Sequence, residues 1–292
     1  MNQNLSKFVK IAGLSIVLVL FSAFSYNSSN SKINVFEAIQ TKKINASWNS
    51  NGKHSGNSVD IKIVNITSSP IELIIPAGTK YSTDNEDEQT LIQLEDQFIA
   101  LAPKQSYNGK VAAFCMEAHD RCPTATSAMK ISKNSNPKLN ELTSYLRGKT
   151  IDKSTYQDAV WAISDSYSVS NIAAEDQASK DFRKKVAEIT GQKNPWFNSP
   201  QNVTIDEQGN FNMETKLIAG QLEFMCEKGT NVHQDIYKAN GDPILVSDKT
   251  MQARYGNVKY RFQIQVKGWE KGDYYIKLHD GNKEITRYEF TI

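Results

Sequence analysis

The clearest evidence for the fold class is the segment Val59-Asp-Ile-Lys-Ile-Val-Asn-Ile-Thr-Ser-Ser-Pro-Ile-Glu-Leu-Ile-Ile75. Hydrophobic residues occupy every second position on both sides of the turn at Ser68-Ser-Pro70. A period of two residues is typical of strands with one buried face. Two further strands are expected at Leu91–Leu101 and Val111–Phe114. The sequence therefore predicts an antiparallel β domain that begins near Ile33.

A helical period replaces this β pattern farther along the chain. The first predicted helix starts at Asn136, which is followed by proline, and ends at Gly148. A second helix is expected to begin with a capping box in which Ser154 precedes Gln157 by three residues. The third is expected over Asp181–Thr190. We expect this three-helix unit to pack on the first β domain.

The last ninety or so residues return to a β pattern. Hairpin signals occur at Gln208-Gly209-Asn210, Asn240-Gly241 and Asp280-Gly281, and hydrophobic and polar residues alternate through Tyr260–Lys267. Short strands at this spacing predict an immunoglobulin-like β-sandwich. The expected fold class is thus α+β and mainly β. The expected segments are a signal peptide (1–25), a tether (26–32), the β domain with its helices (33–192), a linker (193–202) and the sandwich (203–292).

The first 25 residues have the features of a secretory signal peptide. Lys7 and Lys10 precede an apolar run over residues 11–24, and Ala23 and Ser25 are the small residues of a cleavage site. A single membrane anchor is the alternative, but the run is shorter than the roughly 20 residues that a spanning helix needs. We expect a bacterial protein that is secreted, periplasmic or at the cell surface, with no stable membrane span after cleavage.

Charge argues against a nucleic-acid partner. Removal of residues 1–25 takes away two lysines and no acid, so the 34 basic and 32 acidic residues of the whole chain become 32 and 32. Nucleic-acid binding requires a basic excess or stripe. The expected partner is a surface or envelope ligand, either protein or glycan, and no cofactor is implied.

Two of the three cysteines, Cys115 and Cys122, stand seven positions apart. In an oxidising compartment they are candidates for a disulfide. The alternative is a metal site, because Cys115, His119 and Cys122 would share one face of a helix and offer two sulfurs and a nitrogen. Cys226 alternates with Leu222 and Phe224, which predicts a buried core thiol.

Two short motifs resemble those of the thioester domains of bacterial surface adhesins. They are Phe114-Cys115-Met116-Glu117 and Gln157-Asp-Ala-Val-Trp161, in that order along the chain. In that family a cysteine sulfur and a glutamine side chain form an internal thioester that captures an amine on a partner. The resemblance implies the same β-then-helix arrangement and makes Cys115 the thioester candidate, with Gln157 or Gln265 as its glutamine.

The match departs from the family pattern at two points. Tyr156 stands where the second motif has threonine. A third motif, which supplies the acyl glutamine, has its nearest counterpart in Ile264-Gln265-Val-Lys-Gly-Trp269, where glycine occupies an apolar position. A related domain without the covalent bond is therefore expected.

Near the C-terminus, residues 236–244 and Lys271-Gly-Asp-Tyr-Tyr-Ile-Lys-Leu278 resemble the terminal β modules of exported proteins of the Bacteroidetes type, some of which are sorting tails. The motifs of serine hydrolases, zinc proteases, dithiol oxidoreductases and phosphate-binding loops are absent from the sequence. We expect a binding or adhesion protein. The alternative is a secreted hydrolase or metal-binding protein whose site is assembled from residues remote in sequence.

Overall fold

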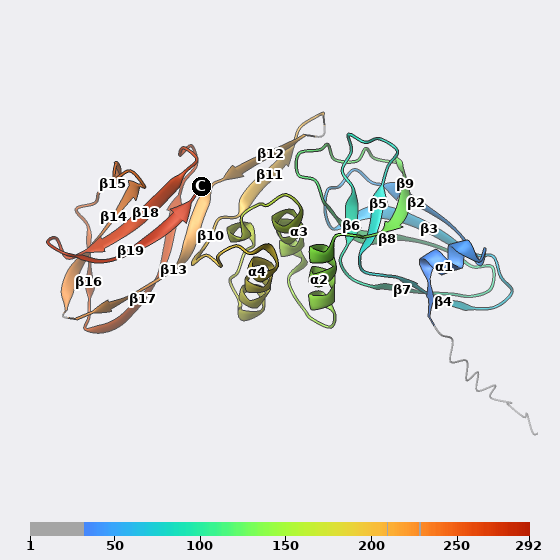
Figure 1. Cartoon of the computed structure of the whole chain (residues 1–292), viewed down its shortest axis with the longest axis horizontal. Coiled ribbons are helices and arrows are strands. Elements are labelled where there is room, and N and C mark those ends of the chain that lie inside the picture. The colour runs from blue at the N-terminus through green and yellow to red at the C-terminus, as the bar shows by residue number, and fades with distance from the viewer. Residues whose placement is uncertain (1–31, 209, 228) are drawn as a thin grey trace, which may run out of the picture. The chain divides into compact units, whose positions relative to one another are not determined.

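The computed structural model describes residues 32–208, 210–227 and 229–292 (Figure 1). The expected signal peptide and all but the last residue of the expected tether lie outside these residues. Within the described part, no helix has the length and apolar character needed to cross a bilayer. The fold is α+β and mainly β, as the sequence predicts.

Six antiparallel strands close into a barrel in the order β2-β3-β8-β6-β5-β9. Their bounds are β2 (Ile44–Ser50), β3 (Asn57–Asn65), β5 (Thr79–Ser82), β6 (Leu91–Gln93), β8 (Ser106–Cys115) and β9 (Ala128–Lys133). The alternation at Val59, Ile61 and Ile63 works as predicted, because all three side chains are buried in the barrel core.

A smaller sheet lies beside the barrel in the order β1-β4-β7. Its strands are β1 (Ile33–Asn34), β4 (Ile71–Ile75) and β7 (Gln97–Leu101). The segment expected to be one strand from Leu91 to Leu101 is therefore two strands in two sheets. The helix α1 (Val35–Gln40) also interrupts the expected β pattern, because the Asn34 side chain accepts a hydrogen bond from the Phe36 N–H and caps it.

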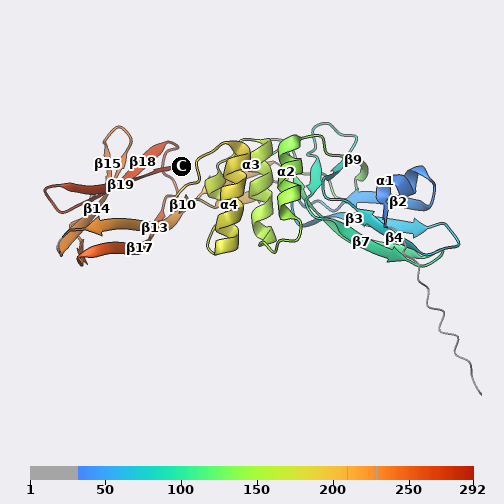
Figure 2. The ribbon, with the colours of Figure 1, turned by 60° about the horizontal axis from the view of Figure 1, so that its bottom comes forward.

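The helical unit contains α2 (Pro137–Leu146), α3 (Tyr156–Ser164) and α4 (Gln177–Thr190), with short 3₁₀ turns at η1 (Lys153–Thr155) and η2 (Val169–Asn171). Figure 2 shows the three α-helices side by side. Asn136 caps α2 as predicted, accepting hydrogen bonds from two backbone N–H groups. The capping box predicted at Ser154 is wrong: Thr155 precedes α3 without a side-chain cap, and the side chain of Gln157 is used elsewhere.

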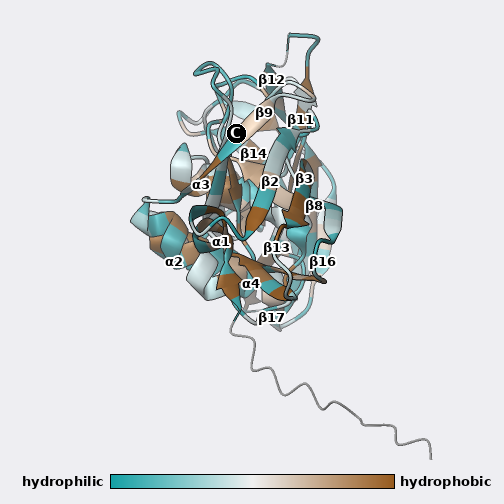
Figure 3. Ribbon diagram, turned by 90° about the vertical axis from the view of Figure 1, so that its right-hand side faces the viewer, coloured by the Kyte–Doolittle hydropathy of each residue, from teal (hydrophilic) through white to brown (hydrophobic). Residues whose placement is uncertain are grey.

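Strands β6 and β8 separate two hydrophobic cores. Leu91 and Cys115 face the barrel core, whereas their neighbours Ile92 and Phe114 belong to a second core formed with the helices. The helices carry both hydrophobic and hydrophilic segments (Figure 3), as expected for helices that bury one face. The helical unit therefore packs on the β domain, as the sequence predicts.

The chain then forms the hairpin of β11 (Gln201–Ile205) and β12 (Phe211–Thr215) and two sheets that enclose a third core. One sheet has the order β10-β13-β17, with β10 (Phe197–Asn198), β13 (Leu217–Cys226) and β17 (Gly256–Gln265). The other has the order β15-β14-β18-β19, with β16 also paired to β14. Its bounds are β14 (Thr230–Lys238), β15 (Pro243–Leu245), β16 (Thr250–Ala253), β18 (Asp273–His279) and β19 (Glu284–Thr291).

Candidate functional site

Cys115 is the last residue of β8, and its side chain is fully buried. Its backbone N–H donates to two acceptors, the carbonyl oxygen of His54 and Oε1 of Gln157, both at 3.0 Å. Nε2 of Gln157 donates in turn to the carbonyl oxygen of Cys115 at 2.8 Å. One buried carboxamide thus holds both backbone groups of Cys115. The N-terminal turn of α3 supplies that carboxamide, which fixes the helix against the end of the strand.

Cys122 returns to Cys115 at the end of a short loop. The two thiols form a hydrogen bond with one another, and Sγ of Cys122 also donates to the Gly52 carbonyl oxygen at 3.4 Å. Burial, followed by the hydrogen bond with Cys122, raises the pKa of Cys115 well above its usual value. The same hydrogen bond lowers the pKa of Cys122. Both residues are thiols in this structure, and Cys122 is the more acidic of the two.

Three carboxyl groups lie along this region. Glu117 accepts a hydrogen bond from the Thr90 N–H at 2.7 Å, and Asp165 accepts one from the Ala118 N–H at 2.6 Å. These contacts attach the loop that follows β8 to the barrel and to the residue after α3. Burial raises the pKa of both groups. Burial alone raises the pKa of Asp158, next to Gln157, to about 7.

A cluster of three aromatic side chains covers this end of the barrel. The Trp161 side chain is 2% exposed, and its ring stacks on His54 with centroids 6.3 Å apart and planes 10° apart. Phe211, from the β12 strand, meets both rings edge-on. The Trp161 indole N–H is buried and has no hydrogen-bond partner among the described residues. Burial lowers the pKa of His54, so its imidazole is neutral at pH 7.

The structure brings together Cys115, Cys122 and Gln157, three of the residues that the sequence marks as site candidates. Gln265 lies apart from them: it is the last residue of β17 and pairs with Leu217 in the sheet around the third core. His119 lies in the loop between Cys115 and Cys122, and the centroid of its ring is 6.2 Å from that of the Tyr167 ring. The candidate site is therefore the end of β8 and the start of α3.

The geometric basis of the metal hypothesis is wrong. Cys115 ends a strand and the residues up to Cys122 are not helical, so the spacing of Cys115, His119 and Cys122 does not place three ligands on one helix face. Residues 32–208, 210–227 and 229–292 contain no group of three or more His, Cys, Asp or Glu side chains arranged to hold a metal ion.

His54 is the part of the site that the sequence does not reveal. It lies among Gly, Asn and Ser residues, a composition that indicates only a loop. Its carbonyl oxygen nevertheless contacts the Cys115 N–H and its ring covers Trp161. The one signal available was Trp161 itself, since a buried indole on a helix requires a partner surface.

Comparisons with known proteins add no family. No family model matches the chain, and a search of curated proteins finds no match. Among the solved structures that match, the likeness is weak. A β-glucosidase from Kluyveromyces marxianus has 9% identity and a TM-score of 0.22, over 80% of this chain and 44% of the glucosidase. The CBM51-2 and INT domains of Clostridium perfringens ZmpB have 10% identity and a TM-score of 0.17, over 85% of this chain and 78% of that one.

Proposed function

We propose that this chain is an exported binding protein of the cell envelope or the extracellular space, with a thioester-domain-like recognition module that lacks the covalent bond. One observation carries the proposal. The two motifs that resemble the adhesin family lie 42 residues apart in sequence, and they meet in space through both hydrogen bonds between Gln157 and the backbone of Cys115. In this proposal the C-terminal β-sandwich is an immunoglobulin-like support that displays the module.

The contacts of Gln157 support a positioning role for this residue. A thioester would require the Cys115 sulfur to attack the side-chain carbonyl carbon of a glutamine, with ammonia as the leaving group. The Gln157 oxygen and nitrogen are both engaged by backbone groups of Cys115. The second candidate, Gln265, belongs to the third-core sheet. These contacts support a role for Gln157 in holding the Cys115 backbone rather than in acylating its sulfur.

Cys115 has a better-placed partner in Cys122. The two thiols are already in contact, and Cys122 has the lowered pKa that favours thiolate attack on an incoming disulfide. After export, a protein disulfide of the thiol-oxidising class would accept two electrons and two protons from the pair and leave the Cys115–Cys122 bond. The loop from β8 to Cys122 would then be closed covalently.

The decisive experiment is the intact mass of the purified mature protein without reductant, with peptide mapping around Cys115. The proposal expects a loss of two hydrogens and a bond between Cys115 and Cys122. A loss of ammonia that methylamine reverses, with addition at a glutamine, would instead establish an internal thioester. That result would replace non-covalent recognition by covalent capture of an amine.

Export and binding need separate tests. The full chain with a C-terminal tag should be found in the periplasmic, surface or culture fraction of a bacterial host, and retention in the cytoplasm would contradict export. The mature protein should bind a panel of surface proteins or glycans without releasing product from them. Turnover of any member of the panel would favour the secreted hydrolase.

A further inference from the structure

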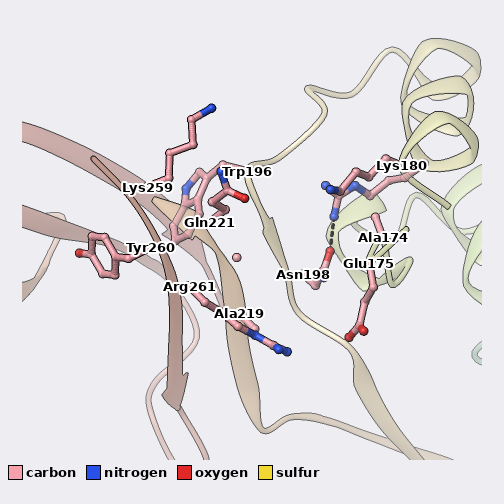
Figure 4. Close-up of a pocket in the computed structure, with 12 residues that line it drawn as sticks. Ala174, Glu175, Lys180, Trp196, Asn198, Ala219, Gln221, Lys259, Tyr260 and Arg261 are labelled. Atoms are coloured by element: carbon pink, nitrogen blue, oxygen red, sulfur yellow. Dashed lines mark hydrogen bonds between the residues drawn. The ribbon is translucent and has the colours of Figure 1, made fainter. Parts of the chain in front are cut away.

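A pocket of about 430 Å³ lies between α4 and the sheet formed by β10, β13 and β17. Residues on or just before α4 line one side, and residues of the three strands and of the segment that leads to β10 line the other (Figure 4). None of them belongs to the Cys115 site. The pocket therefore offers a second place for a ligand, independent of the proposal above.

Positive charge dominates the lining of this pocket. Four cationic side chains line it (Lys180, Arg183, Lys259 and Arg261) against a single acidic one, Glu175. Lys259 forms an ion pair with Glu223, with 2.9 Å between Nζ and Oε2. Lys180 and Arg261 are exposed, and neither forms an ion pair with any residue that the structure describes. A concave surface with cations of this kind attracts anions.

Arg183 strengthens the positive potential from below the surface. Its side chain is buried, and its guanidinium donates to four neutral oxygens: the side chains of Asn194 and Asn198, and the backbone carbonyls of Pro195 and Phe197. No carboxylate of the described residues forms an ion pair with it. Burial lowers its pKa to about 10, which leaves the group charged at pH 7. Its charge is thus held in place without a counter-ion.

Trp196 lines the same pocket as these cationic side chains. The Trp196 indole donates from Nε1 to the Glu289 carbonyl oxygen at 2.6 Å, which fixes the ring. Its six-membered ring lies so close to Gly220 that a Cβ there would be 2.8 Å from Cε3. Gln221 and Asn198 bring amide groups to the same space. Figure 4 shows Lys180 on the α4 side and Trp196, Gln221 and Lys259 on the sheet side.

We propose that this pocket binds an acidic oligosaccharide, whose sugar ring stacks on Trp196 while its carboxylates contact Lys180 and Arg261. An aromatic face with flanking amides suits a sugar ring and its hydroxyl groups. The cations come from two separate elements, α4 and β17, so they fit several charges spread along a chain better than one phosphate. The start of α4 is also closed to a phosphate, because Asp176 already accepts the Ser179 N–H at 2.7 Å.

The test is calorimetric titration of the mature protein with tetragalacturonate and with its methyl ester, which has the same rings without the charges. Binding of the acid form, weakened by added salt and by esterification, is expected. Equal affinity for both forms would overturn the proposal, as would no binding of tetragalacturonate. Tighter binding of ADP than of tetragalacturonate would assign the pocket to phosphate ligands instead.

Variants then locate the binding. The double variant K180Q/R261Q should bind tetragalacturonate about tenfold more weakly, since two partly exposed charge contacts are lost. Arg254→Gln removes an exposed cation outside the pocket lining and should leave the affinity unchanged. Both substitutions of the double variant are on the surface, so circular dichroism should show an unchanged fold. Equal affinities of the double variant and the wild-type protein would exclude this pocket.

Discussion

The Gln157 carboxamide and the backbone of Cys115 form a closed pair of hydrogen bonds of 3.0 and 2.8 Å between the start of α3 and the end of β8. Gln157→Ala leaves the buried Cys115 carbonyl oxygen without this donor. An unpaired buried polar group costs about 1–3 kcal/mol, so the free energy of unfolding should fall by about 2–3 kcal/mol. Urea denaturation followed by circular dichroism measures the change.

Gln177→Ala is the matched control, because the Gln177 side chain makes an exposed contact with Asp181 at the start of α4. Its effect should stay within about 0.5 kcal/mol, as for most surface substitutions. Equal stabilities of the two variants would show that Gln157 does not hold the site together.

The Cys115–Cys122 pair predicts a stability that depends on redox state. A disulfide that closes a loop of this length contributes about 2.5 kcal/mol in the chain-entropy model. The wild-type protein should therefore unfold at a lower temperature in dithiothreitol than without it. Cys122→Ser should unfold at one temperature in both conditions. A wild-type melting temperature that dithiothreitol leaves unchanged would count against the disulfide.

Asp158 predicts a loss of stability with rising pH. Burial raises its folded-state pKa to about 7, above the value of about 3.9 in an unfolded chain. The folded state therefore holds the proton more tightly, and stability declines as the pH rises from about 4 to about 7. Asp158→Asn removes this decline, so the variant should be more stable than the wild-type protein at pH 8. We expect a difference of about 1–3 kcal/mol, which is less than the full pKa difference would give, because the Asp158 side chain is partly exposed. The difference should vanish near pH 4.

The opposite pH dependence of stability is expected at Asp235, which is buried on β14 next to His279 of the neighbouring strand β18. Burial opposes the charged carboxylate, but hydrogen bonds from His279 at 2.9 Å and from Ser247 and Tyr237 outweigh it and lower the pKa. Its stabilisation is thus fully present above about pH 4, the unfolded pKa, and is lost as the pH falls through the lower folded value.

Asp235→Asn should therefore destabilise the protein at pH 6 by about 1–3 kcal/mol, the cost of a lost charge-assisted bond. The gap between the variant and the wild-type protein should narrow below pH 4. A constant gap from pH 6 to pH 3 in urea denaturation would mean that the charge of Asp235 does not contribute.

We expect a larger side chain at Gly220 to disturb the packing against Trp196. A Cβ at this position would lie 2.7 Å from the Trp196 carbonyl oxygen, and the backbone there cannot easily yield. Gly220→Ala should cost about 1–3 kcal/mol, the usual range for overpacking. At Gly229 an added Cβ would meet the Ala253 carbonyl oxygen at an ordinary 3.7 Å. Gly229→Ala should therefore have the smaller effect on the thermal midpoint.

Individual strands and helix ends could be predicted from the sequence, because they depend on residues close together in the chain. The alternation that ends at Ile75 predicted the strands β3 and β4, Asn136 predicted the start of α2, and α4 ends at Thr190 as predicted. Closure of six strands into a barrel was not predicted, because it depends on pairings such as that of β2 with β9. Proximity of Cys115 to Gln157 came from a motif resemblance, whereas the place of His54 depends on a long-range contact that no period records.

The hairpin of β11 and β12 determines where the polypeptide can be divided. Val203, Phe211 and Met213 pack against the barrel core, although they follow the helices in sequence. A fragment that ends at Gly191 would thus expose part of that core to solvent, and one that starts at residue 203 would carry apolar side chains without their neighbours. Phe197 belongs to the third core and β10 pairs with β13, so no single cut between Gly191 and β13 leaves both the barrel core and the third core intact.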